Sequence, residues 1–221
     1  MAEQLTFDLP ARAPLARGDF FVSEANALAL VRLDDALGWP NGKLVLVGPE
    51  GAGKTHLAHV WAAEAGARLV ASRDLANLDV GAVATAIGVD DADRTAPGDE
   101  ATLFHLHNHL AAAGLPLLLT AREAPSRWPT ALPDLRSRME AADIARIEAP
   151  DDALLSAVLM KLFHDRQIVV TPPTIAWLTA HMDRSFAEAQ RVVAALDARA
   201  LAEGRKVTRD LAQELLETDI G

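Results

Sequence analysis

The sequence of 221 residues contains no cysteine, and aromatic residues make up only 5% of it. Without cysteine the chain can form neither a disulfide framework nor a thiolate metal site. It also lacks any apolar run approaching the roughly 18 residues that a membrane-spanning helix needs. The start of the chain, Met1-Ala2-Glu3-Gln4, has neither the basic residues nor the apolar stretch of a secretion signal. These absences predict a soluble, cytoplasmic protein with no membrane partner.

Basic residues are scarce relative to acidic ones, with 21 Lys and Arg against 31 Asp and Glu and a formal net charge of −10. Residues 74–100 contain seven acidic residues and one basic residue, Arg94. Proteins that hold duplex DNA neutralise its phosphates with clustered Lys and Arg. The sequence has no long basic stripe and no basic tail, so we expect no strong direct binding to DNA.

The pattern of apolar residues divides the chain into three parts. Residues 1–17 contain Pro10 and Pro14 without helical periodicity, which predicts a flexible tail. Between residues 18 and 150, short apolar segments alternate with helical segments. Strands are predicted at 43–47, 68–71, 86–90, 115–120 and 143–147, and helices at about 24–37, 54–65, 99–113 and 134–141, with short helices near 73–86. This alternation favours an α/β fold in which helices flank a mainly parallel sheet.

After Pro150 the strand pattern stops. Helices are predicted at about 151–165, 173–182, 185–203 and 208–217. Residues 151–221 are therefore predicted to form a small all-helical lid that follows the α/β base.

The most informative segment is an octet that matches the G-x-x-x-x-G-K-[ST] phosphate-binding pattern. It reads Gly48-Pro49-Glu50-Gly51-Ala52-Gly53-Lys54-Thr55, and a helical run that starts with His56 follows it. Glycines let the backbone turn its N–H groups around phosphate oxygens at the positive end of a helix. Lys54 supplies a charge to the β- and γ-phosphates, and the Thr55 hydroxyl can ligate Mg²⁺. The octet predicts that the chain binds a nucleoside triphosphate or diphosphate with Mg²⁺.

A second motif is acidic and lies at the end of the predicted strand at 86–90. The apolar segment ends in Asp90 and Asp91, as in a Walker B element. Asp90 would hold Mg²⁺, directly or through water, and Asp91 would orient the attacking water. The alternative is that both carboxylates are simply solvated at the end of a strand.

Other polar residues have two open interpretations each. Thr120 and Arg122 follow an apolar run. At the end of such a strand their side chains could face the nucleotide crevice of an α/β fold, or they could be ordinary loop residues. Arg136 and Arg138 lie on a short predicted helix, from which an arginine finger could act on a neighbouring subunit. On spacing alone, surface salt bridges explain them at least as well. Arg184, before the third lid helix, could reach the phosphates or remain a surface residue.

The ordered set of motifs resembles the AAA+ ATPases, and within them the DnaA replication initiators and their short Hda-type relatives. The matching segments are residues 51–57, 89–91, 119–120, 135–138 and 194–200, and the resemblance covers about residues 18–218. It implies that the nucleotide is ATP or ADP, that Arg138 is the finger, and that Arg184 is the lid sensor. It also implies that Phe21 and Val22 line the adenine pocket.

Two further features favour the Hda type within this resemblance. The chain ends at Gly221, where initiators append a DNA-binding helical domain. Residues 4–9 resemble the peptide by which Hda-type proteins dock on the sliding clamp of the replicative polymerase. Leu5, Phe7 and Leu9 alternate, so an extended peptide could insert them into a groove while Gln4 forms hydrogen bonds. The family peptide has Leu then Pro where this chain has Phe7 and Asp8. Alternatively, the tail packs on its own domain or stays disordered.

The resemblance leads to a functional hypothesis. A clamp-docked regulator would stimulate ATP hydrolysis by the initiator DnaA and so prevent re-initiation. Where the family has a small acidic or amide residue at the first sensor, this chain has Arg122, so we expect weak hydrolysis by the protein itself. A finger that acts in trans requires a neighbouring subunit, which leaves a homo-oligomer open. The alternatives are a self-sufficient ATPase such as a helicase loader, and a nucleotide-gated adaptor with no catalytic role.

Overall fold

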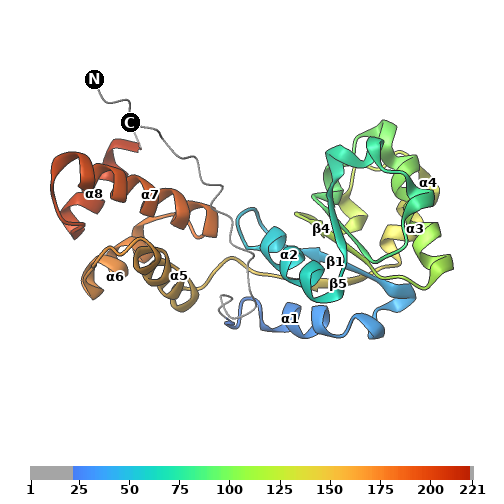
Figure 1. The fold of residues 1–221 in the computed structure, drawn as a ribbon, viewed down its shortest axis with the longest axis horizontal. Helices are drawn as coiled ribbons and strands as arrows, with labels where there is room; N and C mark the ends of the chain where they lie inside the picture. The colour runs from blue at the N-terminus through green and yellow to red at the C-terminus, as the bar shows by residue number, and fades with distance from the viewer. Residues whose placement is uncertain (1–21, 220–221) are drawn as a thin grey trace, which may run out of the picture.

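The computed structural model describes residues 22–219, which form a parallel sheet with flanking helices and then a group of helices (Figure 1). The predicted clamp-binding residues Gln4, Leu5, Phe7 and Leu9 lie outside the described residues, as does Phe21. None of the helices among residues 22–219 is long and apolar enough to cross a membrane.

The sheet has five strands in the order β2-β3-β4-β1-β5, and every neighbouring pair is parallel. The strands are β1 Lys43–Val47, β2 Arg68–Ala71, β3 Ile87–Asp90, β4 Leu117–Ala121 and β5 Asp143–Arg146. The central strands β1 and β4 are buried along their whole length. Their uninterrupted apolar runs are what a parallel strand covered on both faces requires. The predicted α/β fold class is confirmed.

Alternate side chains of β1 enter two separate cores, because successive residues of a strand point to opposite faces. Leu44 and Leu46 pack with helices α1 (Ala27–Asp34) and α2 (Lys54–Ala65). Val45 and Val47 pack with α3 (Glu100–Ala113) and α4 (Pro133–Glu140). Helices thus cover both faces of the sheet, and the carboxyl ends of all five strands share one edge.

Some predicted element boundaries were wrong for local reasons. Helix α1 is shorter than the predicted 24–37, since Asp35 accepts a hydrogen bond from the Gly38 N–H and turns the chain into a 3₁₀ turn. The short helices predicted near 73–86 are present as two 3₁₀ helices, Ser72–Asn77 and Val80–Ala82. Strand β4 begins after Pro116, which has no N–H to give to a ladder.

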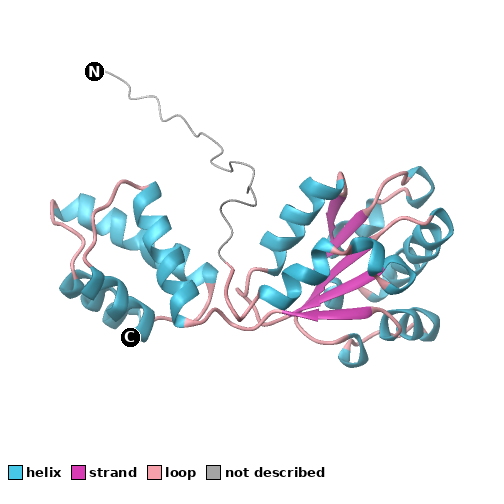
Figure 2. Cartoon of the chain, turned by 90° about the horizontal axis from the view of Figure 1, so that it is seen from below, coloured by secondary structure: helices cyan, strands magenta, loops and turns pink. Residues whose placement is uncertain are grey.

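The remaining helices are α5 Asp152–Asp165, α6 Pro172–His181, α7 Phe186–Glu203 and α8 Arg209–Asp219, and they share a core of their own around Phe163. Three of them start at a capping side chain: Asp151 accepts from the Leu154 N–H at 2.7 Å, Ser185 from the Glu188 N–H at 3.0 Å, and Thr208 from the Leu211 N–H at 3.3 Å. Figure 2 shows these helices grouped at one end of the molecule, beside the sheet rather than on either of its faces. The N-terminus of α7 returns to the sheet at the loop after β1.

Candidate nucleotide-binding site

The loop between β1 and α2 has a backbone that only glycine adopts readily. Gly51 and Gly53 have φ of +73° and +94°, in the left-handed region. Gly53 is also the N-cap of α2 and has no side chain with which to accept from the N–H groups of the first turn. These donors have no partner inside the helix, and they lie at the positive end of its dipole. The loop therefore fits the phosphates of a nucleotide, as the octet predicts.

The two glycines also leave space for the start of α7 to pack against the loop. The Phe186 N–H, at the start of α7, donates to the Gly51 carbonyl at 2.9 Å. A Cβ at Gly51 would lie 2.4 Å from the Cβ of Ser185, and one at Gly53 would lie 2.8 Å from the Phe186 ring. Real Cβ atoms do not approach so closely, so glycine at both positions lets the helical group rest directly on the phosphate-binding loop.

Lys54 lies under the loop and is only 7% exposed. Its Nζ donates to the carbonyls of Gly48 and Pro49, each at 2.8 Å. An ammonium group has three N–H donors, so one remains for a phosphate oxygen. Burial lowers the pKa of Lys54, while the carboxylates of Asp91 and Asp93 raise it. Lys54 is thus a buried cation beneath the loop, with acidic residues nearby.

Residues from three separate segments meet beside Lys54. The Thr55 hydroxyl lies 3.0 and 3.1 Å from the two carboxylate oxygens of Asp90. The buried Thr120 hydroxyl donates to Asp90 at 2.6 Å and accepts from the Asp91 N–H at 2.9 Å. Asp91 has a φ of 55°, uncommon for a residue other than glycine. The structure therefore brings together the octet, the double-aspartate motif and the end of β4.

The oxygen atoms of Thr55 and Asp90 suit Mg²⁺, which takes one or two protein oxygens and completes its shell with phosphates and water. Within residues 22–219 no group of three His, Asp or Glu side chains could hold a metal. A magnesium ion at this position would thus depend on the nucleotide for its other ligands.

Arg122 lies at the same edge of the sheet, directly after β4. Its guanidinium contacts the Glu50 carboxylate of the phosphate-binding loop at 2.6 Å. Its backbone N–H donates to Asp93 at 2.9 Å. The sequence analysis predicted neither the contact of Arg122 with Glu50 nor that with Asp93. The three residues follow the ends of β4, β1 and β3, and no local sequence pattern shows which residues at these strand ends are in contact.

Arg184 precedes the two lid residues that touch the loop. Its guanidinium pairs with Asp152 at 2.6 Å, and both side chains are half exposed or more. Exposed pairs of this kind contribute little stability, so the guanidinium can exchange partners readily. Arg184 therefore lies next to the residues that touch the loop, but its guanidinium contacts Asp152 of α5.

Arg138 lies far from this edge. It is exposed on α4, whose buried side chains are Leu135 and Met139. Its positive charge acts on Lys43, where it adds to burial in lowering the pKa of that residue. Lys43 begins β1, whereas the phosphate-binding loop follows the other end of that strand, about 13 Å away at ~3.3 Å per residue. Arg136, by contrast, donates to the Thr130 carbonyl and so belongs to the structure of its own loop.

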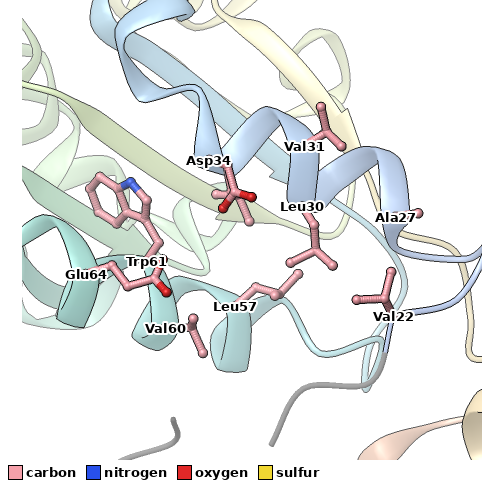
Figure 3. Close-up of a pocket in the computed structure, with 10 residues that line it drawn as sticks. Val22, Ala27, Leu30, Val31, Asp34, Leu57, Val60, Trp61 and Glu64 are labelled. Atoms are coloured by element: carbon pink, nitrogen blue, oxygen red, sulfur yellow. The ribbon is translucent and has the colours of Figure 1, made fainter. Parts of the chain in front are cut away.

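Val22 is 66% exposed and lines a cavity of about 320 Å³ between α1 and α2. Figure 3 shows Val22 and Ala27 at one end of this cavity, Trp61 with Glu64 at the other, and Leu57 between them. Leu57 belongs to the first turn after the octet, as does the half-buried His56. Val22, which the resemblance to AAA+ proteins assigns to the adenine pocket, thus lies near the start of α2.

Curated relatives of the chain include chromosomal replication initiator proteins. It is 27% identical over 115 residues (52% of this chain) to DnaA of Bacteroides thetaiotaomicron, and 29% identical over 119 residues (53%) to DnaA of Sphingopyxis alaskensis. About half of the chain is therefore homologous to DnaA. These segments make up 24% and 26% of the two initiators, so the chain spans about a quarter of their length. No protein-family model matches the sequence.

Solved structures share the fold over more of the chain. Domain III of the Thermotoga maritima replication initiation protein DnaA matches with a TM-score of 0.80, covering 96% of this chain and 98% of that one at 18% identity. This is the AAA+ fold. The AMPPCP-bound DnaA from Aquifex aeolicus has a TM-score of 0.71 and 18% identity, covering 84% of this chain and 66% of that one. The Thermotoga maritima RuvB Holliday junction branch migration motor has a TM-score of 0.70 and 17% identity, covering 93% and 72%. The AAA+ fold is thus shared with initiators and with a DNA motor.

Proposed function

We propose that this AAA+ protein is an Hda-type regulator of replication initiation, which binds ADP or ATP, docks on the sliding clamp and stimulates ATP hydrolysis by DnaA. Homology to DnaA supports the replication context. The position of Arg138, exposed and at the opposite edge of the sheet from the phosphate-binding loop, is the observation that carries the regulatory part of the proposal.

In this proposal the residues around the loop hold the nucleotide. The N–H groups of the loop and Lys54 bind its phosphates, and Thr55 with Asp90 ligates Mg²⁺. Val22 and Phe21 contact the base, and Arg184 exchanges Asp152 for a phosphate oxygen. Bound Mg²⁺ would neutralise charge on the terminal phosphates. The nucleotide would fix the angle between the sheet and the lid, since Ser185 and Phe186 already rest on the loop.

Arg138 acts on a different molecule in this proposal. A side chain beside the start of β1 cannot reach the phosphates bound beyond the end of that strand in its own subunit. An exposed guanidinium at that position is, however, free to enter the nucleotide site of a neighbour and stabilise charge in its transition state, as an arginine finger does. The neighbour would be ATP-bound DnaA, whose AAA+ domain has the same fold.

The proposal is tested by ATP hydrolysis of purified DnaA in the presence of DNA-loaded clamp and the protein. Removing the guanidinium in Arg138→Ala should reduce the stimulated rate at least a hundredfold, since a finger is worth about 10³–10⁵ in kcat. Arg127→Ala is a matched control, because Arg127 is also an exposed arginine of the base and pairs with Glu123. It should stimulate normally. Normal stimulation by Arg138→Ala, with nucleotide affinity unchanged, would refute the finger.

A second candidate function is ATP hydrolysis by the protein itself. The network of Thr55, Asp90, Asp91 and Thr120 favours it, since it would supply ligands for Mg²⁺ and a carboxylate for the attacking water. Steady-state hydrolysis measured without DnaA separates the two. A regulator would hydrolyse ATP slowly on its own, and a self-sufficient ATPase would hydrolyse it rapidly. A purely nucleotide-gated adaptor would neither hydrolyse ATP itself nor accelerate hydrolysis by DnaA.

A further inference from the structure

Lys43 and Arg138 come together where the end of α4 leads into β5. Arg138 lies in the last turn of α4, and the chain then enters β5, whose first residue, Asp143, is opposite Leu44 of β1. The last turn of α4 therefore lies beside the start of β1, and Lys43 is the first residue of that strand. Lys43 shares a face of the sheet with Val45, because alternate residues of a strand point the same way. That face packs on α3 and α4.

Lys43 is unusual for a lysine because it is almost completely buried. It is 3% exposed, and its pKa is lowered by burial and by the positive charge of Arg138. His107, on the buried side of α3, is also 3% exposed. Burial lowers the pKa of His107, and the charges of Lys43 and Arg138 lower it further, against a hydrogen bond from the Asn108 side chain that raises it. The three side chains thus form a basic cluster at the amino edge of the sheet.

Within residues 22–219, no carboxylate pairs with Lys43 or Arg138. Asp143, at the start of β5, instead pairs at 3.1 Å with Arg32 of α1, the helix on the other face of the sheet. Glu140 is exposed and two residues from Arg138 on α4, a spacing at which helical side chains do not face each other. A nearly buried ammonium group without an opposite charge costs free energy, the more so beside a second cation. A residue that costs stability in this way is typical of a functional position.

We propose that Lys43 is a positioning residue for the arginine finger: its buried charge repels the Arg138 guanidinium and keeps it directed outward, towards the nucleotide of a partner molecule. This inference rests on the proposed function, in which Arg138 enters the nucleotide site of DnaA. Two like charges repel more strongly beside the protein interior than in water, because the effective dielectric constant is lower there. Without Lys43, the long side chain of Arg138 would lie back over the apolar surface at the start of β1. The repulsion thus orders the finger before the partner binds, which reduces the entropy lost on binding.

The test measures ATP hydrolysis by DnaA at increasing concentrations of the protein, with DNA-loaded clamp present. Lys43→Met keeps the length of the side chain and removes its charge. We expect the maximal stimulated rate to fall about three- to tenfold, because fewer guanidinium groups point outward. The concentration that gives half-maximal stimulation should stay the same, since the docking surfaces are intact. Lys43→Arg, which keeps the charge, should restore most of the rate. Lys206→Met is a matched control that removes the same charge from an exposed residue of the lid, and it should stimulate normally.

Two measurements on the free protein distinguish positioning from a structural role. Lys43→Met should raise the midpoint of thermal unfolding, because it removes an unpaired charge from a buried position. A loss of stimulation in this variant would then not come from misfolding. An NMR titration of His107 should give a higher pKa in Lys43→Met and in Arg138→Ala, since each variant removes a cation that lowers it. An unchanged His107 pKa in both variants would mean that the three side chains form no cluster, and would overturn the inference.

The outcomes also separate this inference from the proposed function. Normal stimulation by Arg138→Ala would overturn the finger and this inference with it. Loss of stimulation in Arg138→Ala together with a wild-type rate in Lys43→Met would overturn the inference alone. A loss in Lys43→Met that Lys43→Arg does not restore would also overturn it, since the shape of the side chain rather than its charge would then matter. The double variant Lys43→Met with Arg138→Ala should stimulate as weakly as Arg138→Ala and no more weakly, because Lys43 acts only through the finger.

Discussion

Thr120 organises both acids of the double-aspartate motif through one buried hydroxyl. It donates to the Asp90 carboxylate and accepts from the Asp91 N–H. Asp91 is in the left-handed region, where a residue other than glycine is held only if its surroundings fix it. The hydroxyl therefore supports the carboxylate that we propose as a Mg²⁺ ligand and an uncommon backbone conformation at the same time.

Thr120→Val has nearly the same shape but can make neither hydrogen bond. We expect it to lower the free energy of unfolding by about 1–3 kcal/mol, since a buried donor and acceptor lose their partner. It should also weaken the Mg²⁺ dependence of nucleotide binding. Urea unfolding and a magnesium titration of nucleotide affinity measure these effects. Thr95→Val is the control, because the Thr95 hydroxyl donates to a backbone carbonyl, that of Ala92, and to neither aspartate of the motif. A normal magnesium titration in Thr120→Val would contradict the role given to this hydroxyl.

At the scale of elements, the N-terminus of α7 packs against the loop that precedes α2. The contact consists of the Phe186 N–H bonded to Gly51 and of Ser185 and Phe186 packed on Gly51 and Gly53. Two helices that are distant in the sequence thus begin at the same point, and a change in the loop must also move the lid.

Gly51→Ala should therefore be more damaging than its small size suggests. A left-handed alanine costs about 1–2 kcal/mol by itself, and its Cβ would also overlap Ser185. Gly66→Ala is a matched control, because Gly66 has a φ of +61° at the other end of α2 and no described atom within 4 Å of an added Cβ. We expect Gly51→Ala to exceed this control in loss of stability and to lower ADP affinity at least tenfold. Equal effects in urea unfolding and ADP binding would mean that the lid does not depend on the loop.

At the scale of the whole molecule, the proposed function uses separate regions for separate partners. The proposed nucleotide site lies at the carboxyl edge of the sheet, and Arg138 lies towards the opposite edge. The proposed clamp-binding peptide, residues 4–9, precedes the described residues. A regulator with this arrangement could hold its own nucleotide, the clamp and a DnaA molecule at once.

Removal of residues 1–9 should abolish binding to the sliding clamp, because Leu5, Phe7 and Leu9 would provide its apolar contacts. It should leave ADP affinity and the unfolding midpoint unchanged. Surface plasmon resonance on immobilised clamp measures the first quantity, and calorimetry with thermal unfolding measures the others. Leu5→Ala with Phe7→Ala should reproduce the loss, whereas Arg12→Ala, outside the peptide, should not. Undiminished clamp binding after the deletion would reject this peptide.

The sequence alone determined the features whose physics is local. The octet predicts a phosphate-binding loop because its glycines, its lysine and the following helix act within a few consecutive residues. The alternating apolar pattern predicts a parallel sheet with helices on both faces, and parallel strands end at one edge, so polar residues at strand ends were expected near the loop. Thr55, Asp90 and Thr120 indeed meet there, although 35 and 30 residues separate them from one another.

Tertiary structure alone decided which residues face one another across that edge. The strand order places β4 beside β1, and only this neighbourhood brings Arg122 to Glu50. The return of α7 to the loop likewise places Ser185 on Gly51. These contacts join residues far apart in the chain, and the packing of the complete sheet and lid selects them. No short-range pattern records such packing, because a side chain's own sequence neighbours do not determine what approaches it in space.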